Sequence, residues 1–172
     1  MTGAVAGAGL AFWFSRDQIQ TPISTPEIAR PNDRRVSSYK PSLYGVDHQA
    51  NRLQTVPLTV EAENPQQALR ISLERLIAGS PELYSEVPPK TKLLDLSLSG
   101  QEIRLNLSQE FTGGGGSASM TRRLAQVLYT ATSLDPQAKV FLLVEGKPLQ
   151  NLGGEGVEVL QPIRREDVPS EF

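Results

Sequence analysis

The stretch from Leu107 to Pro148 constrains the fold more than any other part of this 172-residue chain. It reads as the end of a strand, four consecutive glycines at 113–116, a serine, an amphipathic helix, an Asp-Pro stop and an apolar strand. Apolar residues at 124, 127, 128, 131 and 134 have helical spacing. The pair Asp135-Pro136 ends this helix, because proline disfavours the helical region for its predecessor. Phosphate-binding loops share this order of strand, glycine loop and helix, so nucleotide binding is the first hypothesis to examine.

The glycine run matches none of the signatures that would give it a chemical role. A Walker loop needs G-x-x-x-x-G-K-[ST], and here Gly116 is followed by Ser117 and Ala118 without a lysine. The dinucleotide fingerprint G-x-G-x-x-G needs a further glycine at the helix start, which is missing. A nucleophile elbow, G-x-S-x-G, fails because Ser119 occupies its last position. The sequence instead predicts a flexible connection, with Ser117 or Ser119 as the N-cap of the helix.

A second interpretation of the same loop is an anion site. Backbone N–H groups at a helix start attract carboxylates and phosphates, and two arginines follow closely. Such a site would hold a small anion or a cell-wall polymer. Its candidate residues are Gly113, Gly114, Gly115, Gly116, Ser117, Ser119, Arg122 and Arg123.

Composition excludes several other kinds of site. The chain has no cysteine and one histidine, so thiolate sites and multi-histidine zinc sites are excluded. The single histidine, His48, is predicted to be a solvated side chain in a polar linker. Carboxylate pairs such as Glu61 and Glu63 carry no sign of a glycosidase pocket. The chain has a formal net charge of −2, whereas nucleic-acid binding usually needs a basic face. We therefore predict no catalytic residue, no metal, no cofactor and no nucleic-acid partner.

Two segments precede the predicted globular domain. Residues 1–14 are apolar, rich in glycine and alanine, and end in Phe12-Trp13-Phe14. This run is shorter than the roughly 20 residues that span a bilayer. It is either an apolar start without a role or the outer half of a membrane anchor, and the aromatic end favours the anchor. Residues 15–55 are polar and proline-rich, which predicts a disordered tether. We therefore expect attachment to a membrane through the N-terminus.

Residues 56–165 are patterned as one small domain, followed by a charged tail at 166–172. A strand is predicted near 58–60, a helix after the capping sequence Asn64-Pro65-Gln66-Gln67, and a hairpin over the alternating leucines of 94–107. With the second helix and the strand at 140–144, the order is β-α-β-β-α-β. The expected fold class is α+β, with both helices packed on one face of a small mixed or antiparallel sheet.

Several segments of this domain resemble the GerMN domain of the sporulation and spore germination family, in the form found in cyanobacterial envelope proteins. The resemblance extends from about residue 56 to residue 165. It rests on five stretches: Leu105–Leu107 leading to Phe111, the run Gly113–Ser117, RLAQVLYTATSLDP from Arg123 to Pro136, VFLLVEGKPL from Val140 to Leu149, and LGGEGVEV from Leu152 to Val159.

The resemblance implies an extracytoplasmic, membrane-anchored protein without assigned catalytic residues, and a fold similar to the ring-building modules of secretion systems. Many family members have an acidic residue early in the second helix, where this chain has Met120, Thr121, Arg122 and Arg123. We expect a non-enzymatic interaction module of the cell envelope, whose partners are envelope proteins and further copies of itself. The alternative function is binding of an anion or a cell-wall polymer at the glycine loop.

Overall fold

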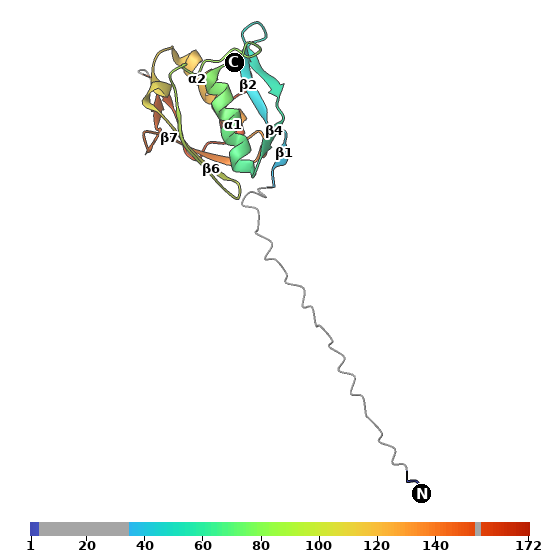
Figure 1. Ribbon diagram of the computed structural model, residues 1–172. Coiled ribbons are helices and arrows are strands. Elements are labelled where there is room, and N and C mark those ends of the chain that lie inside the picture. The colour runs from blue at the N-terminus through green and yellow to red at the C-terminus, as the bar shows by residue number, and fades with distance from the viewer. Residues whose placement is uncertain (4–34, 154–155) are drawn as a thin grey trace. The chain divides into compact units, whose positions relative to one another are not determined.

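The computed structural model describes residues 1–3, 35–153 and 156–172. The chain divides into two units, Met1–Asp33 and Arg34–Phe172, and the account that follows concerns the second (Figure 1). Its elements, in chain order, are β1 (Ser37–Tyr39), β2 (Ser42–Asp47), β3 (Arg52–Pro57), β4 (Val60–Ala62), α1 (Pro65–Ala78), β5 (Leu93–Ser99), β6 (Glu102–Leu107), the 3-10 turn η1 (Gln109–Thr112), α2 (Ser117–Ala131), β7 (Lys139–Val144), β8 (Lys147–Pro148), β9 (Asn151–Leu152), β10 (Val157–Glu158) and the 3-10 turn η2 (Arg165–Asp167).

The largest sheet has four strands in the order β5-β6-β7-β8. Strands β5 and β6 form the predicted antiparallel hairpin, β6 and β7 run parallel, and β8 returns antiparallel beside β7. The parallel pair is joined through α2, as a crossover between parallel strands requires. On the helix side of this sheet, Ile103, Leu105, Val140 and Leu142 are at most 1% exposed. The predicted α+β class and its mixed sheet are confirmed.

Helix α1 begins where the sequence predicts, because its first turn is capped from both directions. The Asn64 side chain accepts a hydrogen bond from the Gln67 backbone N–H at 2.9 Å, and Gln67 Oε1 accepts one from the Glu63 N–H at 2.7 Å. Proline 65 occupies the first turn, and Gly79 ends the helix with a φ of 81°. Its buried leucines at 69, 73 and 76 join those of α2 in one core between the helices and the sheet. Both helices therefore lie on one face of the sheet, as predicted (Figure 1).

The structure corrects the predicted linker at 15–55. Strands β2 and β3 pair along their full length, and β1 pairs with β4. Leu43 and Val46 are 4% and 2% exposed and belong to the core. The Tyr44 backbone N–H donates to Thr130 Oγ1 of α2 at 3.2 Å, which joins this hairpin to the domain. The folded unit thus starts some 20 residues before the predicted boundary at 56. Of the predicted strand at 58–60, residues 58 and 59 lie between β3 and β4, and Val60 begins β4.

The C-terminal residues also belong to the fold, although the sequence predicted a charged tail at 166–172. Ser170 accepts a hydrogen bond from the Leu53 N–H at 2.8 Å, and the Phe172 N–H donates to the Asn51 carbonyl at 2.8 Å. Val168 is 5% exposed. The C-terminus therefore lies beside the β2–β3 hairpin (Figure 1).

The predicted anchor at 1–14 and the start of the predicted tether fall almost wholly outside the described residues. Within the described part of the chain, no helix has the length and apolar character needed to cross a membrane.

Candidate functional site

The glycine loop at 113–116 connects η1 to α2, and its shape depends on backbone conformations that favour glycine. Gly114 and Gly115 have φ values of 66° and 87°. A Cβ atom on Gly115 would also lie 2.8 Å from Ser119 Oγ. Because L side chains rarely adopt positive φ, these two glycines are explained by the turn itself.

Arg123 fixes this loop from inside the protein. Its side chain is 3% exposed and donates to four backbone carbonyls. Nη1 donates to the Phe111 and Gly113 oxygens at 2.6 and 3.0 Å, Nη2 to Gly114 at 3.0 Å, and Nε to Glu86 at 3.0 Å. Burial lowers the pKa of the Arg123 guanidinium from its ordinary value, and the nearby Glu86 charge opposes that shift. A guanidinium stays charged in proteins. The donors of this buried cation are therefore occupied by backbone carbonyls.

The prediction that Ser117 or Ser119 caps α2 is wrong. The N-cap position is Gly116, and no side chain caps the first turn. Ser119 Oγ instead donates to Glu86 Oε2 at 2.7 Å, in the loop that precedes β5. With Gly116 at the N-cap, Ser117 and Ser119 lie inside the first turn, and the Ser119 hydroxyl forms a charge-assisted hydrogen bond to this carboxylate. The first N–H groups of α2 are therefore left without a side-chain acceptor.

His48 lies in the folded unit, in the turn between β2 and β3, and not in a linker as predicted. Its ring meets the Tyr84 ring edge-on, with centroids 4.3 Å apart, and its Nε2 is 3.7 Å from Glu86 Oε1. Glu86 thus lies between the Ser119 hydroxyl and the imidazole. In a Ser-His-Asp triad the imidazole must contact the hydroxyl to accept its proton. The cluster of Ser119, Glu86 and His48 has the wrong order for that chemistry.

Arg122 points away from the glycine loop. Its Nη2 donates to Asn51 Oδ1 at 2.7 Å, and its guanidinium lies 5.5 Å from the ring centroid of Phe172. Arg122 therefore links α2 to the β2–β3 turn and the C-terminus. Of the predicted anion-binding residues, the structure brings together the four glycines, Ser117, Ser119 and Arg123, and it separates Arg122 from them.

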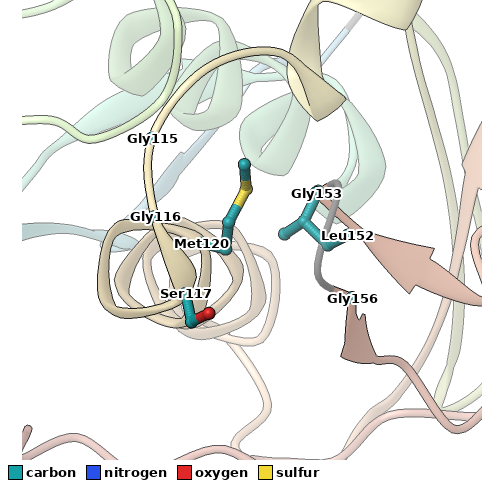
Figure 2. A pocket seen from close by; sticks show the side chains of 7 residues that line it. All are labelled: Gly115, Gly116, Ser117, Met120, Leu152, Gly153 and Gly156. Carbon is teal, nitrogen blue, oxygen red and sulfur yellow. The ribbon is translucent and has the colours of Figure 1, made fainter.

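A pocket of about 210 Å³ opens beside the start of α2. It is lined by Gly115, Gly116, Ser117, Met120, Leu152, Gly153 and Gly156. Figure 2 shows Met120 and Leu152 facing each other across it. Gly153 has a φ of 85°, and a Cβ atom there would lie 2.9 Å from Met120 Cε. The sequence prediction gave no site role to Leu152, Gly153 and Gly156, which supply this opposite wall. Neither arginine lines the pocket.

The pocket's polar groups are backbone amides and the Ser117 hydroxyl. Among the residues that the structure describes, no group of three or more His, Cys, Asp or Glu side chains is placed to hold a metal ion.

Comparison with known proteins identifies the family. The sequence model of the family described as Germane, sporulation and spore germination, matches residues 42–150. The chain belongs to this family. The match begins in β2, in agreement with the β2–β3 hairpin being part of the GerMN domain, and it stops before β9. No curated protein matches the chain.

Solved structures share the GerMN fold. The first GerMN domain of the sporulation protein GerM from Bacillus subtilis has a TM-score of 0.59 and 19% identity, over 75% of this chain and 99% of that chain. The tandem GerMN domains of the same protein have a TM-score of 0.58 and 22% sequence identity, over 76% of this chain and 48% of that chain. A protein described as a lipoprotein from Clostridium perfringens has a TM-score of 0.56 and 20% sequence identity, over 79% of this chain and 92% of that chain. At these identities the similarity establishes the fold and nothing further.

Proposed function

We propose that this GerMN protein is a non-enzymatic interaction module of the cell envelope, and that it binds through the outer face of the sheet β5-β6-β7-β8. Two proteins of similar structure, one described as a lipoprotein and one a sporulation protein, support the envelope location. The observation that carries the proposal is the composition of the sheet face directed away from the helices.

That face combines apolar and charged side chains in adjacent rows. Alternation along β6 and β7 places the residues opposite in parity to Ile103 and Val140 on the outer side. The register sets Arg104 beside Phe141, Glu102 beside Lys139 and Asn106 beside Leu143. Glu102 and Arg104 are exposed, while Phe141 and Leu143 are partly exposed. The Arg104 guanidinium lies 5.2 Å from the Phe141 ring centroid. Aromatic and arginine side chains are the types that dominate binding energy in protein interfaces.

The charges on this face suit a second copy of the chain. Glu102 and Asp95 are acidic, Arg104 and Lys139 are basic, and all four belong to adjacent strands. A two-fold axis through such a face sets the acids of one copy opposite the bases of the other. Such a two-fold contact gives a dimer, and binding to another envelope protein would use the same side chains.

The free edge of β5 is a weaker candidate for the contact, because three features obstruct strand addition. A register irregularity lies between Leu93 and Asp95. The outward Leu98 N–H is already bonded to Gln66 Oε1 at 3.0 Å. Arg70 of α1 reaches to 3.7 Å from Asp95 Oδ1. Bulges and charges of this kind protect edge strands from pairing with another chain.

The test is sedimentation velocity of the full chain over a concentration series, combined with photo-crosslinking from position 143 in cells. Phe141→Ser is expected to weaken association by about tenfold or more, as for an aromatic hot spot. Val36→Ser is the matched control, since Val36 is 61% exposed and precedes β1, outside the sheet. A chain that stays monomeric throughout and gives no crosslink from position 143 would exclude this function.

A second function, binding of an anion or a cell-wall polymer, is favoured by one observation. The uncapped N–H groups of α2 open beside the 210 Å³ pocket. The Glu86 carboxylate near Ser119 opposes it, and the Arg123 donors are occupied. Titration with phosphate and with soluble peptidoglycan fragments tests this function. Ser117→Asp would place a competing charge in the first turn and abolish such binding. If binding is absent in the native chain, or unchanged in Ser117→Asp, the loop is not the binding site.

A further inference from the structure

A different pocket, of about 350 Å³, lies at the ends of the two helices. The start of α1, the end of α2, the β5–β6 turn and β1 all contribute to it. Its floor is apolar and buried: Leu69, Ile103, Ala131 and Ala138 are at most 2% exposed. The side chains of Tyr39, Leu98 and Leu134 form partly exposed walls. The result is an apolar hollow that opens to solvent and is separate from the glycine loop and from the outer sheet face.

One side of this pocket is acidic. Asp135 is the single charged residue among those that line it. Gln101 Nε2 donates to Asp135 Oδ2 at 3.0 Å, and the Gln137 N–H donates to Oδ1 at 3.0 Å. These bonds hold the carboxylate in place, and each oxygen still has a lone pair for a further donor.

The end of α2 adds to this negative potential. The last helical residue, Ala131, lines the pocket, and the last turn carries no basic side chain. The C-terminus of a helix carries a partial negative charge that favours a nearby cation. Lys139, the closest basic residue in sequence, lies opposite Glu102 in the β6–β7 register and does not line the pocket.

We infer that this pocket binds an apolar side chain of a partner protein, leucine or phenylalanine in size, that stands next to a lysine or arginine. The hollow buries the apolar group, and burial of one such side chain corresponds to roughly tenfold to hundredfold in affinity. The neighbouring cation meets Asp135 and the end of α2, which adds roughly a few-fold because that pair stays near solvent. This inference does not depend on the sheet face, since the two surfaces share no residue.

The experiment is an NMR titration of the isotope-labelled full chain with two blocked peptides, one containing Phe-Lys and the other Phe-Glu. The amides of Ala131, Leu134 and Ala138 are expected to shift with the Phe-Lys peptide, which should bind a few-fold more tightly than the Phe-Glu peptide. Absence of shifts at these amides for both peptides, or equal affinity for the two, would overturn the inference.

Four variants separate the contributions. Asp135→Asn keeps an acceptor for Gln101 and leaves the end of α2 unchanged, so it is expected to reduce the preference for the Phe-Lys peptide. Ala131→Leu fills the floor and should remove binding of both, with Leu134→Gln as a second variant should Ala131→Leu fail to fold. Glu102→Gln removes a carboxylate from the outer sheet face and should change neither affinity. A preference for Phe-Lys as large in Asp135→Asn as in the native chain would contradict the role of Asp135. Binding that persists in Ala131→Leu and Leu134→Gln would contradict the pocket.

A last probe distinguishes a protein partner from a small amphiphile, since n-octylammonium offers the same chemistry. Shifts at the pocket amides with n-octylammonium, without any for the Phe-Lys peptide, would overturn the assignment to a protein segment. Phe141→Ser should leave all these titrations unchanged, so loss of the sheet-face function and loss of the pocket function give different results.

Discussion

Nη1 of Arg123 lies 2.6 Å from the carbonyl oxygen of Phe111, the last buried residue before the glycine loop. The same guanidinium binds the Gly113 and Gly114 oxygens, so one side chain on α2 orders the chain that leads into α2. An exposed loop with positive-φ glycines would otherwise have many conformations. The buried Arg123 guanidinium thus holds the glycine loop in one conformation.

Replacing this cation should destabilise the protein strongly. Arg123→Met leaves four carbonyls without their donor, and we expect a loss of about 3 kcal/mol in the free energy of unfolding. Urea denaturation measures the loss, and hydrogen exchange of residues 113–116 reports the loop. Arg122→Met is the control: it removes one side-chain hydrogen bond and a ring contact, and should cost about 1 kcal/mol. Equal losses for the two variants would show that Arg123 does not order the loop.

Gly45 should tolerate no side chain. A Cβ atom there would lie 2.5 Å from Leu83 Cγ and 3.1 Å from the Tyr84 carbonyl oxygen. Gly45→Ala is expected to cost about 2 kcal/mol, because the loop at 83–84 must move away from β2. Gly113→Ala is the matched substitution, since its nearest atom is at 3.4 Å and its φ is −84°. Thermal denaturation should show a clear loss for Gly45→Ala and little change for Gly113→Ala.

The two helix starts should respond differently to alanine. Asn64→Ala removes an observed cap and should cost about 1 kcal/mol. Ser117→Ala removes no cap bond from α2 and should stay within about 0.5 kcal/mol. Chemical denaturation of both variants provides the comparison. A large loss for Ser117→Ala would mean that its hydroxyl caps the helix in solution.

Asp47 should contribute stability that disappears in acid. Its Oδ1 accepts from the Ala50 and Gln49 N–H groups in the β2–β3 turn, and these bonds lower the pKa of Asp47 below its ordinary value of 3.8. A carboxyl whose pKa is lower in the folded state stabilises the protein above the unfolded pKa. That contribution is lost as the pH falls through the folded value. Urea midpoints of the native chain and Asp47→Asn should therefore differ near neutral pH and converge in acid. A difference between the two urea midpoints that stays constant with pH would contradict a stabilising role of the Asp47 carboxylate.

Local sequence signals predicted the parts of the fold that local interactions build. The cap at Asn64, the glycine at 79, the leucine hairpin and the helix after the glycine loop all appear in the structure. That helix ends at Ala131, before the predicted stop at Asp135-Pro136. The strands β1 to β3 escaped prediction because they have few apolar residues and take their support from distant partners. The Tyr44 backbone, for example, is bonded to the side chains of Thr130 and Gln126, more than 80 residues away.

The candidate site was predicted less well, for a related reason. Sequence reasoning offered Arg123 as a donor to a bound anion, because it follows closely after the predicted helix start. Whether such a side chain meets carbonyls or an anion depends on how the loop folds back over the helix. Likewise, the pocket at the helix ends draws its lining from four separate segments, and no spacing along the chain brings Tyr39 beside Leu134.

The C-terminal segment pairs with strands of the GerMN domain although it lies outside the range that the family model matches. The family is recognised over residues 42–150, yet β3 and β7 each take a backbone partner from outside that range, Ser170 for Leu53 and Ile163 for Val140. The range that the family model matches is therefore shorter than the folded unit, Arg34–Phe172. A fragment trimmed to residues 42–150 would lose these two backbone partners of β3 and β7. The exposed strand edges would favour aggregation, which would be an effect of the truncation. Fusion, display and binding work should carry residues 35–172 intact, and any oligomer seen with a shorter piece deserves suspicion.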